Sequence, residues 1–115
     1  MIKRLFLAAL IFASPPGVAS AQETDVSVAM IGAGAMSCAR WRSTPQNVSE
    51  GSVWIYGFWT GLNYVAAASD QGQAKIDDAA ILAEVRKTCA AQPSQALASA
   101  VWATYLRSEK SRPGR

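Results

Sequence analysis

Two cysteines, Cys38 and Cys89, are the residues with the clearest capacity for chemistry, because the 115-residue chain has no histidine. The absence of histidine excludes the usual catalytic triads, histidine metal sites and the ordinary histidine pH switch. Two cysteines are too few for a structural zinc site, and their separation fits no redox-active pair. In an exported protein these thiols are expected to form a disulfide. The sequence therefore predicts a protein that is not an enzyme and that has no metal or cofactor.

Two further patterns could support chemistry, and each has a simpler structural explanation. Asp77 and Asp78 form a carboxylate pair, but adjacent residues on a helix point about 100° apart, and no partner residue defines a pocket. At a helix N-terminus they would interact favourably with the helix dipole. Residues 32–34, Gly-Ala-Gly, match only part of a dinucleotide fingerprint, because Ser37 takes the third glycine position and no convincing strand precedes them.

Residues 1–21 have the pattern of a secretory signal peptide. Two basic residues precede an apolar stretch over residues 5–13, and small residues lead to a predicted cleavage site after Ala21. The apolar stretch is too short to cross a bilayer core of roughly 30 Å, which argues against an anchor helix. We therefore expect a periplasmic protein whose mature chain, residues 22–115, has 115 minus 21, or 94, residues.

The charge of the mature chain is close to neutral. Removing Lys3 and Arg4 from the eleven basic residues leaves nine against eight acidic residues, a formal charge of +1. This balance predicts no nucleic-acid partner. No apolar run of eighteen residues follows the signal, so we also expect no membrane association after cleavage.

The rest of the chain is organised around a helix predicted over residues 53–68, which hold five of the ten aromatic residues. A strand is less consistent with about sixteen residues that close in a run of alanines. At 3.6 residues per turn the apolar stripe is wide, so other elements must cover it. Four of these five aromatic residues are expected either to belong to the core or to bind a client or partner protein; they are Trp54, Phe58, Trp59 and Tyr64.

Gly57 and Gly61 lie four residues apart on one side of this helix. Each glycine lowers helix stability by about 1 kcal/mol relative to alanine, so a packing role is expected. We predict that another helix, the last one with Trp102, packs closely there; a dimerisation face is the alternative. Asn63 either reaches solvent or satisfies a buried backbone group.

The remaining elements are expected to be short helices and loops. Residues 22–36 are small and polar and predict a flexible lead-in, and a short helix carrying Cys38 follows from Ser37 to near Ser43. Residues 43–46 predict a turn, after which Asn47 would cap the central helix, with Glu50 completing a capping box.

Two amphipathic helices follow. Asp77 is expected to cap the first, which carries Cys89 and ends at Gln92-Pro93. Ser94 is expected to cap the second, and residues 109–115 predict a disordered basic tail. The fold class is thus all-α, a small bundle of about four helices in a domain over residues 37–108, stapled by one disulfide.

Six positions then form a pattern that resembles the HdeA/HdeB family of periplasmic acid-stress chaperones. The pattern combines a helix-borne cysteine, a central Trp-x-x-Gly-Phe-x-x-Gly helix and Cys-x3-Pro-x3-Leu leading into a last amphipathic helix; it includes Cys38, Trp54, Gly57, Cys89, Pro93 and Leu97. The resemblance spans about residues 37–106. This chain departs from the family in its basic tail and in the aromatic and glycine content of its central helix.

The resemblance implies an all-helical domain with one disulfide that is dimeric near neutral pH. In acid such a domain would loosen and expose apolar surface to unfolding client proteins. The family's cysteines would correspond to Cys38 and Cys89, and its central aromatic helix to residues 54–64. Without histidine the trigger must come from carboxylates: protonating all eight near pH 2 to 3 takes the formal charge from +1 to about +9.

The chain also resembles the small periplasmic immunity proteins of type VI secretion effectors, which are helical and stapled by cysteines. Those proteins typically carry an additional cysteine pair, which this chain lacks. This second resemblance implies an alternative function, inhibition of one specific periplasmic protein partner.

Overall fold

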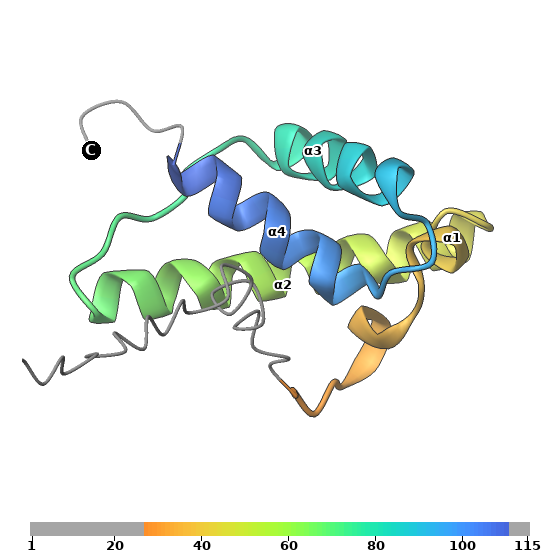
Figure 1. Cartoon of the computed structure of the whole chain (residues 1–115), viewed down its shortest axis with the longest axis horizontal. Helices are drawn as coiled ribbons and strands as arrows, with labels where there is room; N and C mark the ends of the chain where they lie inside the picture. The colour runs from red at the N-terminus through yellow and green to blue at the C-terminus, as the bar shows by residue number, and fades with distance from the viewer. Residues whose placement is uncertain (1–26, 111–115) are drawn as a thin grey trace, which may run out of the picture.

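The computed structural model describes residues 27–110, and this part of the chain is an all-α bundle of four α-helices. A 3-10 helix, η2 (Gly32–Ala35), precedes α1 (Cys38–Trp41), α2 (Pro45–Ala68), α3 (Asp78–Ala91) and α4 (Leu97–Lys110). The only β-type pairing in these residues is a single isolated bridge between Ser37 and Ala96. In Figure 1, α4 crosses the molecule between α2 and α3, and it packs against both. The predicted fold class is confirmed.

The N-terminus of α2 differs from the expected one. The helix begins at Pro45, where the fixed φ of proline suits the first helical position, and the Thr44 side chain accepts a hydrogen bond from the Asn47 N–H at 3.0 Å. Thr44 is therefore the cap, and the predicted cap at Asn47 was wrong. The predicted turn over residues 43–46 is correct only for Ser43 and Thr44, because Pro45 and Gln46 belong to α2. The Asn47 amide instead donates to the carbonyl of Arg40 at 3.1 Å, which joins the start of α2 to α1.

The disulfide between Cys38 and Cys89 is present, with the two Cα atoms 5.2 Å apart. It ties the first turn of α1 to the end of α3, as predicted. The backbone strengthens the same junction, since the Cys38 N–H donates to the Gln95 carbonyl at 2.9 Å and the Ala39 N–H donates to the Pro93 carbonyl at 2.9 Å. The loop between α3 and α4 thus contacts α1 directly.

The last two helices also start differently from their predicted capping pattern. Asp77 is the N-cap residue of α3, but its side chain makes no capping hydrogen bond. The last helix begins at Leu97, three residues beyond Ser94, and the Leu97 N–H donates to the Met36 carbonyl at 2.8 Å. A backbone carbonyl from the region before α1 therefore satisfies the start of α4.

The core lies where α2, α3 and α4 meet α1. Trp41 is fully buried, and its indole N–H donates to the Val48 carbonyl at 3.2 Å. Gly51 allows this ring to lie against α2, because a Cβ at that position would come within 2.6 Å of Trp41 Nε1. The other large, fully buried apolar side chains are Ile55, Val85, Leu97 and Val101.

The described part of the predicted flexible lead-in is packed on the bundle. Within residues 27–36, η2 lies against both α2 and α4. Gly34 is buried there. Part of the predicted lead-in thus contacts the bundle through η2, whereas residues 22–26, the predicted signal peptide 1–21 and the tail residues 111–115 lie outside the described residues. Glu109 and Lys110, predicted to belong to the tail, end α4.

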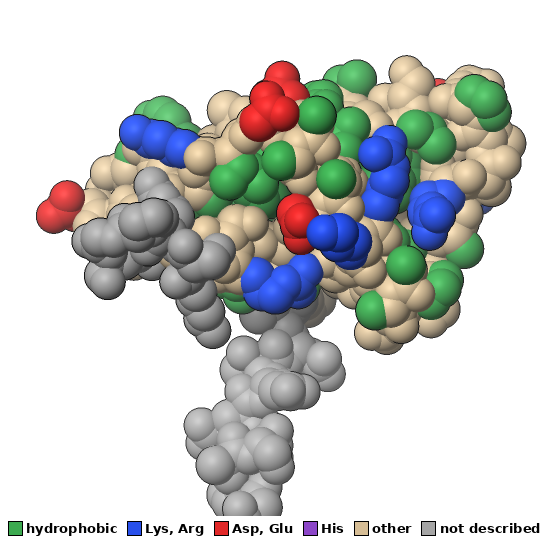
Figure 2. All heavy atoms as spheres, turned by 90° about the horizontal axis from the view of Figure 1, so that it is seen from above, with side chains coloured by type: hydrophobic (Ala, Val, Ile, Leu, Met, Phe, Trp, Pro, Cys, Tyr) green, Lys and Arg blue, Asp and Glu red, His purple; other side chains and the backbone are tan. Residues whose placement is uncertain are grey.

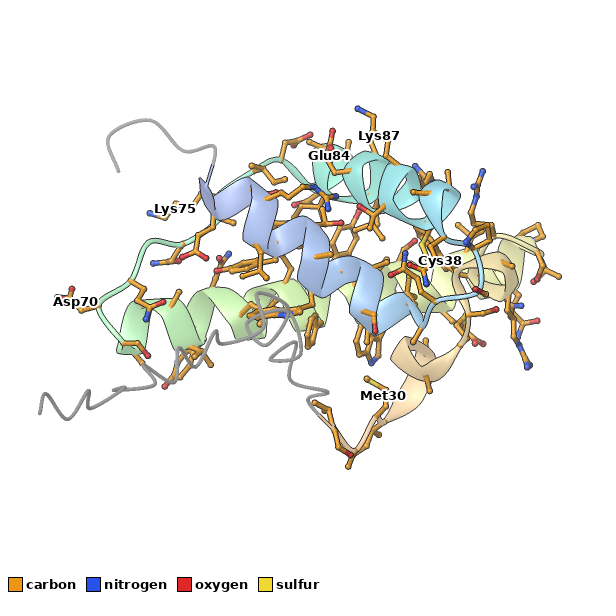
Figure 3. All side chains as sticks on the ribbon, viewed as in Figure 1. Met30, Cys38, Asp70, Lys75, Glu84 and Lys87 are labelled. Atoms are coloured by element: carbon orange, nitrogen blue, oxygen red, sulfur yellow. A yellow bond between two sulfur atoms is a disulfide. The ribbon has the colours of Figure 1, made fainter. Side chains whose placement is uncertain are left out.

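Charge is distributed without a dominant patch on the face viewed in Figure 2. Acidic and basic side chains are interspersed there among apolar ones. One ion pair on α3 joins Lys87 and Glu84 at 3.1 Å, and both side chains are well exposed (Figure 3). Within residues 27–110 no helix is long and apolar enough to cross a bilayer.

Candidate functional site

The four aromatic residues predicted to bind a partner lie in three different environments. Trp59 is a core residue, only 3% exposed, and its ring packs edge-on against Tyr105 with centroids 5.0 Å apart. Its indole N–H donates to the Ala74 carbonyl at 2.8 Å, which pins the loop before α3. Tyr64 is 76% exposed on the outside of α2. Trp59 is thus unavailable to a partner in this conformation, whereas Tyr64 is freely accessible.

Trp54 and Phe58 are half-buried and lie at the edge of the bundle. Their rings stack with centroids 5.0 Å apart. The Trp54 indole N–H donates to the Ile31 carbonyl at 2.9 Å, so its polar atom is satisfied by the segment before α1. The two rings form one continuous aromatic surface that this segment covers in part.

Phe58 lines an apolar hollow between α2, α4 and the residues before η2, which we call the α2–α4 groove. The groove has a volume of about 360 Å³, and its lining residues are Val28, Met30, Phe58, Ala98, Ser99 and Trp102. Figure 3 shows Met30 pointing from the N-terminal segment toward the bundle. Trp102 is 46% exposed, and its ring stacks on Tyr105 with centroids 6.5 Å apart. The groove is an open surface that carries two large aromatic side chains from different helices.

Gly57 and Gly61 do not pack against another helix. A Cβ built on either glycine meets no atom within 4 Å, and both residues are exposed. The predicted close packing of the last helix with Trp102 over these glycines was therefore wrong. Ile55 faces the core, and Gly57, two residues further on, is rotated by about 200° to the opposite side of α2.

The outer face of α2 is instead exposed and uncharged. It includes Val53, 70% exposed, together with the two glycines, Tyr64 and Val65. No charged residue occurs from position 51 to position 69, about five helical turns. The outer face of α2 is therefore a candidate contact surface for another protein.

Asn63 forms a hydrogen bond with a buried backbone group, which is one of the two roles predicted for it. Its Oδ1 accepts hydrogen bonds from the Ala74 N–H at 3.0 Å and from the Tyr105 hydroxyl at 2.9 Å. A second, more polar hollow of about 370 Å³ lies beside it, with Lys75 and Asp78 in its lining. Within residues 27–110 no three His, Cys, Asp or Glu side chains gather into a group that could hold a metal ion.

No family model, curated protein or solved structure matches the chain. The resemblance to the HdeA/HdeB family therefore stands on its motif residues alone. The exposed aromatic groove and the uncharged α2 face are the features from which a function can be argued.

Several residues of this site were not predicted from the sequence. Val28 and Met30 fell in the expected flexible lead-in, although their spacing of two in an uncharged stretch was a usable signal for a segment with one apolar side. Ser99 carried no signal of its own. Gly34 and Gly51 each accept a tryptophan ring, and only the tertiary arrangement of those rings distinguishes them from Gly57 and Gly61.

Proposed function

We propose that this protein is a periplasmic holdase that binds apolar segments of unfolding proteins in the α2–α4 groove, most strongly in acid. The observation that carries the proposal is the groove itself, in which Phe58 and Trp102 face an open apolar hollow. Its volume of about 360 Å³ is near the lower end of the range for ligand pockets, about 300–1,000 Å³. That size suits a few side chains of an extended chain better than a folded protein.

Acid would expose more apolar surface around the groove, because it would raise the net positive charge of the protein. The described carboxylates are exposed or half-exposed, and the one buried polar side chain in residues 27–109 is Thr104. Protonation of the eight carboxylates of the mature chain would raise its formal charge from +1 to about +9, so the basic residues would repel one another. The disulfide would limit the resulting expansion and keep α1 beside α3.

The outer face of α2 supports a second candidate, the inhibitor of a specific periplasmic protein. Val53, Tyr64 and Val65 are exposed there without any unfolding, so a folded partner could dock at neutral pH. A second copy of the chain is a further candidate for this face, in a homodimer. The two candidate functions thus use different surfaces, which makes them separable by mutation.

The test compares two lysine substitutions on exposed positions, because lysine stays charged at both pH 7 and pH 3. Ser99→Lys places a charge in the α2–α4 groove without removing a packed side chain, and Ala83→Lys places the same charge on α3 as a control. Light scattering of an acid-labile client at pH 3 should show protection by the wild type and by Ala83→Lys, and loss of protection with Ser99→Lys.

Capture of periplasmic proteins at pH 7 and pH 3 separates the two functions. Many clients bound only at pH 3 would support the holdase. A single stoichiometric partner at pH 7 that Tyr64→Ala releases and Ser99→Lys retains would support the inhibitor. Absence of binding and of protection at both pH values would exclude both functions.

A further inference from the structure

The segment formed by residues 27–35, here called the N-terminal strap, has no charged residue and reads Ser-Val-Ala-Met-Ile-Gly-Ala-Gly-Ala. Its first part has no regular secondary structure and its second part is η2. The strap lies across the same surface that the proposed function assigns to clients, because Val28 and Met30 line the α2–α4 groove beside Phe58 and Trp102.

Two specific contacts hold the strap on Trp54. The Ile31 carbonyl accepts a hydrogen bond from the indole N–H at 2.9 Å. Gly34 lies directly on the indole ring, where a Cβ would come within 2.6 Å of Trp54 Cε2. Gly32 permits the turn between these contacts, since its φ of 81° is in the region that favours glycine. The strap thus offers Trp54 a backbone carbonyl for its indole N–H and a small residue against its ring.

Little of the surface of the strap is nevertheless buried against the bundle. Gly34 is its only buried residue, while the residues Val28 and Ile31 are 60% and 84% exposed. Segments with few buried apolar contacts open at a free energy well below that of global unfolding. The strap can therefore leave Trp54 and Phe58 while the disulfide-linked helices remain folded.

We propose that the strap is a built-in occupant of the binding surface, and that an extended, uncharged segment of an unfolding protein displaces it and binds in the same way. The incoming segment would place a small residue on the Trp54 ring, offer a carbonyl to its indole N–H and put an apolar side chain into the groove. This inference rests on the proposed function for its biological meaning, and it names the substrate class: segments rich in glycine and alanine with valine or methionine nearby.

The test uses the full mature chain and a fluorescently labelled peptide with the strap sequence. Gly34→Ala inserts a methyl group into the Trp54 ring and should release the strap. Gly57→Ala inserts the same methyl group where it meets nothing within 4 Å, and is the matched control. Fluorescence anisotropy should show the peptide binding Gly34→Ala at least about tenfold more tightly than it binds the wild type or Gly57→Ala, because the intramolecular competitor is weakened.

Two controls address specificity. A peptide with Met30→Glu should bind Gly34→Ala poorly, because a carboxylate would enter the apolar groove. Adding Trp54→Phe to Gly34→Ala removes the indole N–H and should weaken peptide binding about fivefold, the equivalent of one hydrogen bond of about 1 kcal/mol. Hydrogen exchange of residues 27–35 reports release of the strap independently, and circular dichroism reports the helices.

Three results would overturn the inference: a strap that stays protected in Gly34→Ala, a released strap with no gain in peptide affinity, or a gain that Trp54→Phe leaves unchanged. Peptide binding is measured at neutral pH without an aggregating client, so it is independent of the holdase assay. Peptide displacement without client protection would refute the proposed function and leave this binding mode standing.

Discussion

The Tyr105 hydroxyl donates a hydrogen bond to Asn63 Oδ1 at 2.9 Å, which joins α4 to α2 at a point that also holds the loop before α3. The same oxygen accepts the Ala74 N–H at 3.0 Å, and Ala74 is fully buried. One amide oxygen therefore connects three segments that are distant in sequence. The node lies beside Trp59, whose indole N–H binds the Ala74 carbonyl from the other side.

Asn63→Ala should lower the free energy of unfolding by about 2–3 kcal/mol, because it removes the hydrogen bonds that Asn63 Oδ1 accepts from the buried Ala74 N–H and from the Tyr105 hydroxyl. Urea denaturation followed by tryptophan fluorescence would measure this loss. Thr60→Ala, at an exposed position on the same helix, is the control and should change stability by less than about 0.5 kcal/mol. Equal losses for the two variants would show that the Asn63 node does not stabilise the fold.

The disulfide should account for a large part of the stability. Cys38 and Cys89 are 51 positions apart, and closing a loop of that length stabilises by roughly 4 kcal/mol in the chain-entropy model. The double variant Cys38→Ala/Cys89→Ala should therefore unfold at markedly lower denaturant concentration than the oxidised wild type. Mass spectrometry of a non-reduced digest checks the bond itself, and two free thiols in protein purified without reductant would contradict it.

Gly57→Leu should leave the monomer folded and raise its stability by up to about 1 kcal/mol, because it removes a helical glycine and adds a side chain in open space. Thermal melting and multi-angle light scattering would be measured together. An oligomer present in the wild type and lost in Gly57→Leu would place the outer face of α2 in a subunit interface. A fall in the melting temperature of the monomer would contradict the open space seen at this position.

Gly51→Ala should behave in the opposite way to Gly57→Ala, although both add one methyl group to α2. At Gly51 the methyl group would overlap the buried Trp41 ring, and overpacking of this kind costs about 1–3 kcal/mol. At Gly57 it should stabilise the helix slightly. Differential scanning calorimetry of the two variants checks this contrast, and a similar melting temperature for both would contradict the packing of Trp41 on α2.

Local features of the fold were predictable from the sequence because they depend on neighbouring residues. The spacing of apolar residues in residues 78–91 indicates a helix whatever it packs against, and Gln92-Pro93 ends it. The disulfide followed from the residue inventory, since the sequence has two cysteines and export was expected from residues 1–21. The predicted cap of α2 was wrong because Thr44 and Asn47, three positions apart, both have capping side chains. The prediction also placed Pro45 inside a turn, whereas this proline begins the helix.

The candidate site was less predictable because its residues come from three segments. Phe58 and Trp102 meet at the groove only because α4 crosses α2 at this point, and the strap completes the lining. Trp54, Phe58 and Trp59 are all aromatic and close in sequence. Trp59 nevertheless lies in the core, whereas the other two are half-buried at the surface. Tertiary contacts with Ala74 and Tyr105 make that distinction.

The sequence by itself determined the helical class, the single disulfide and the central aromatic helix, because periodicity and residue type act over a few neighbouring positions. Only the tertiary structure decided which side of α2 is covered. Apolar and small residues surround most of that helix, so its hydrophobic pattern does not select one face. The position of α4, set by the Met36 carbonyl and the Asn63–Tyr105 hydrogen bond, buries Ile55 and Trp59 and leaves Gly57 and Gly61 exposed.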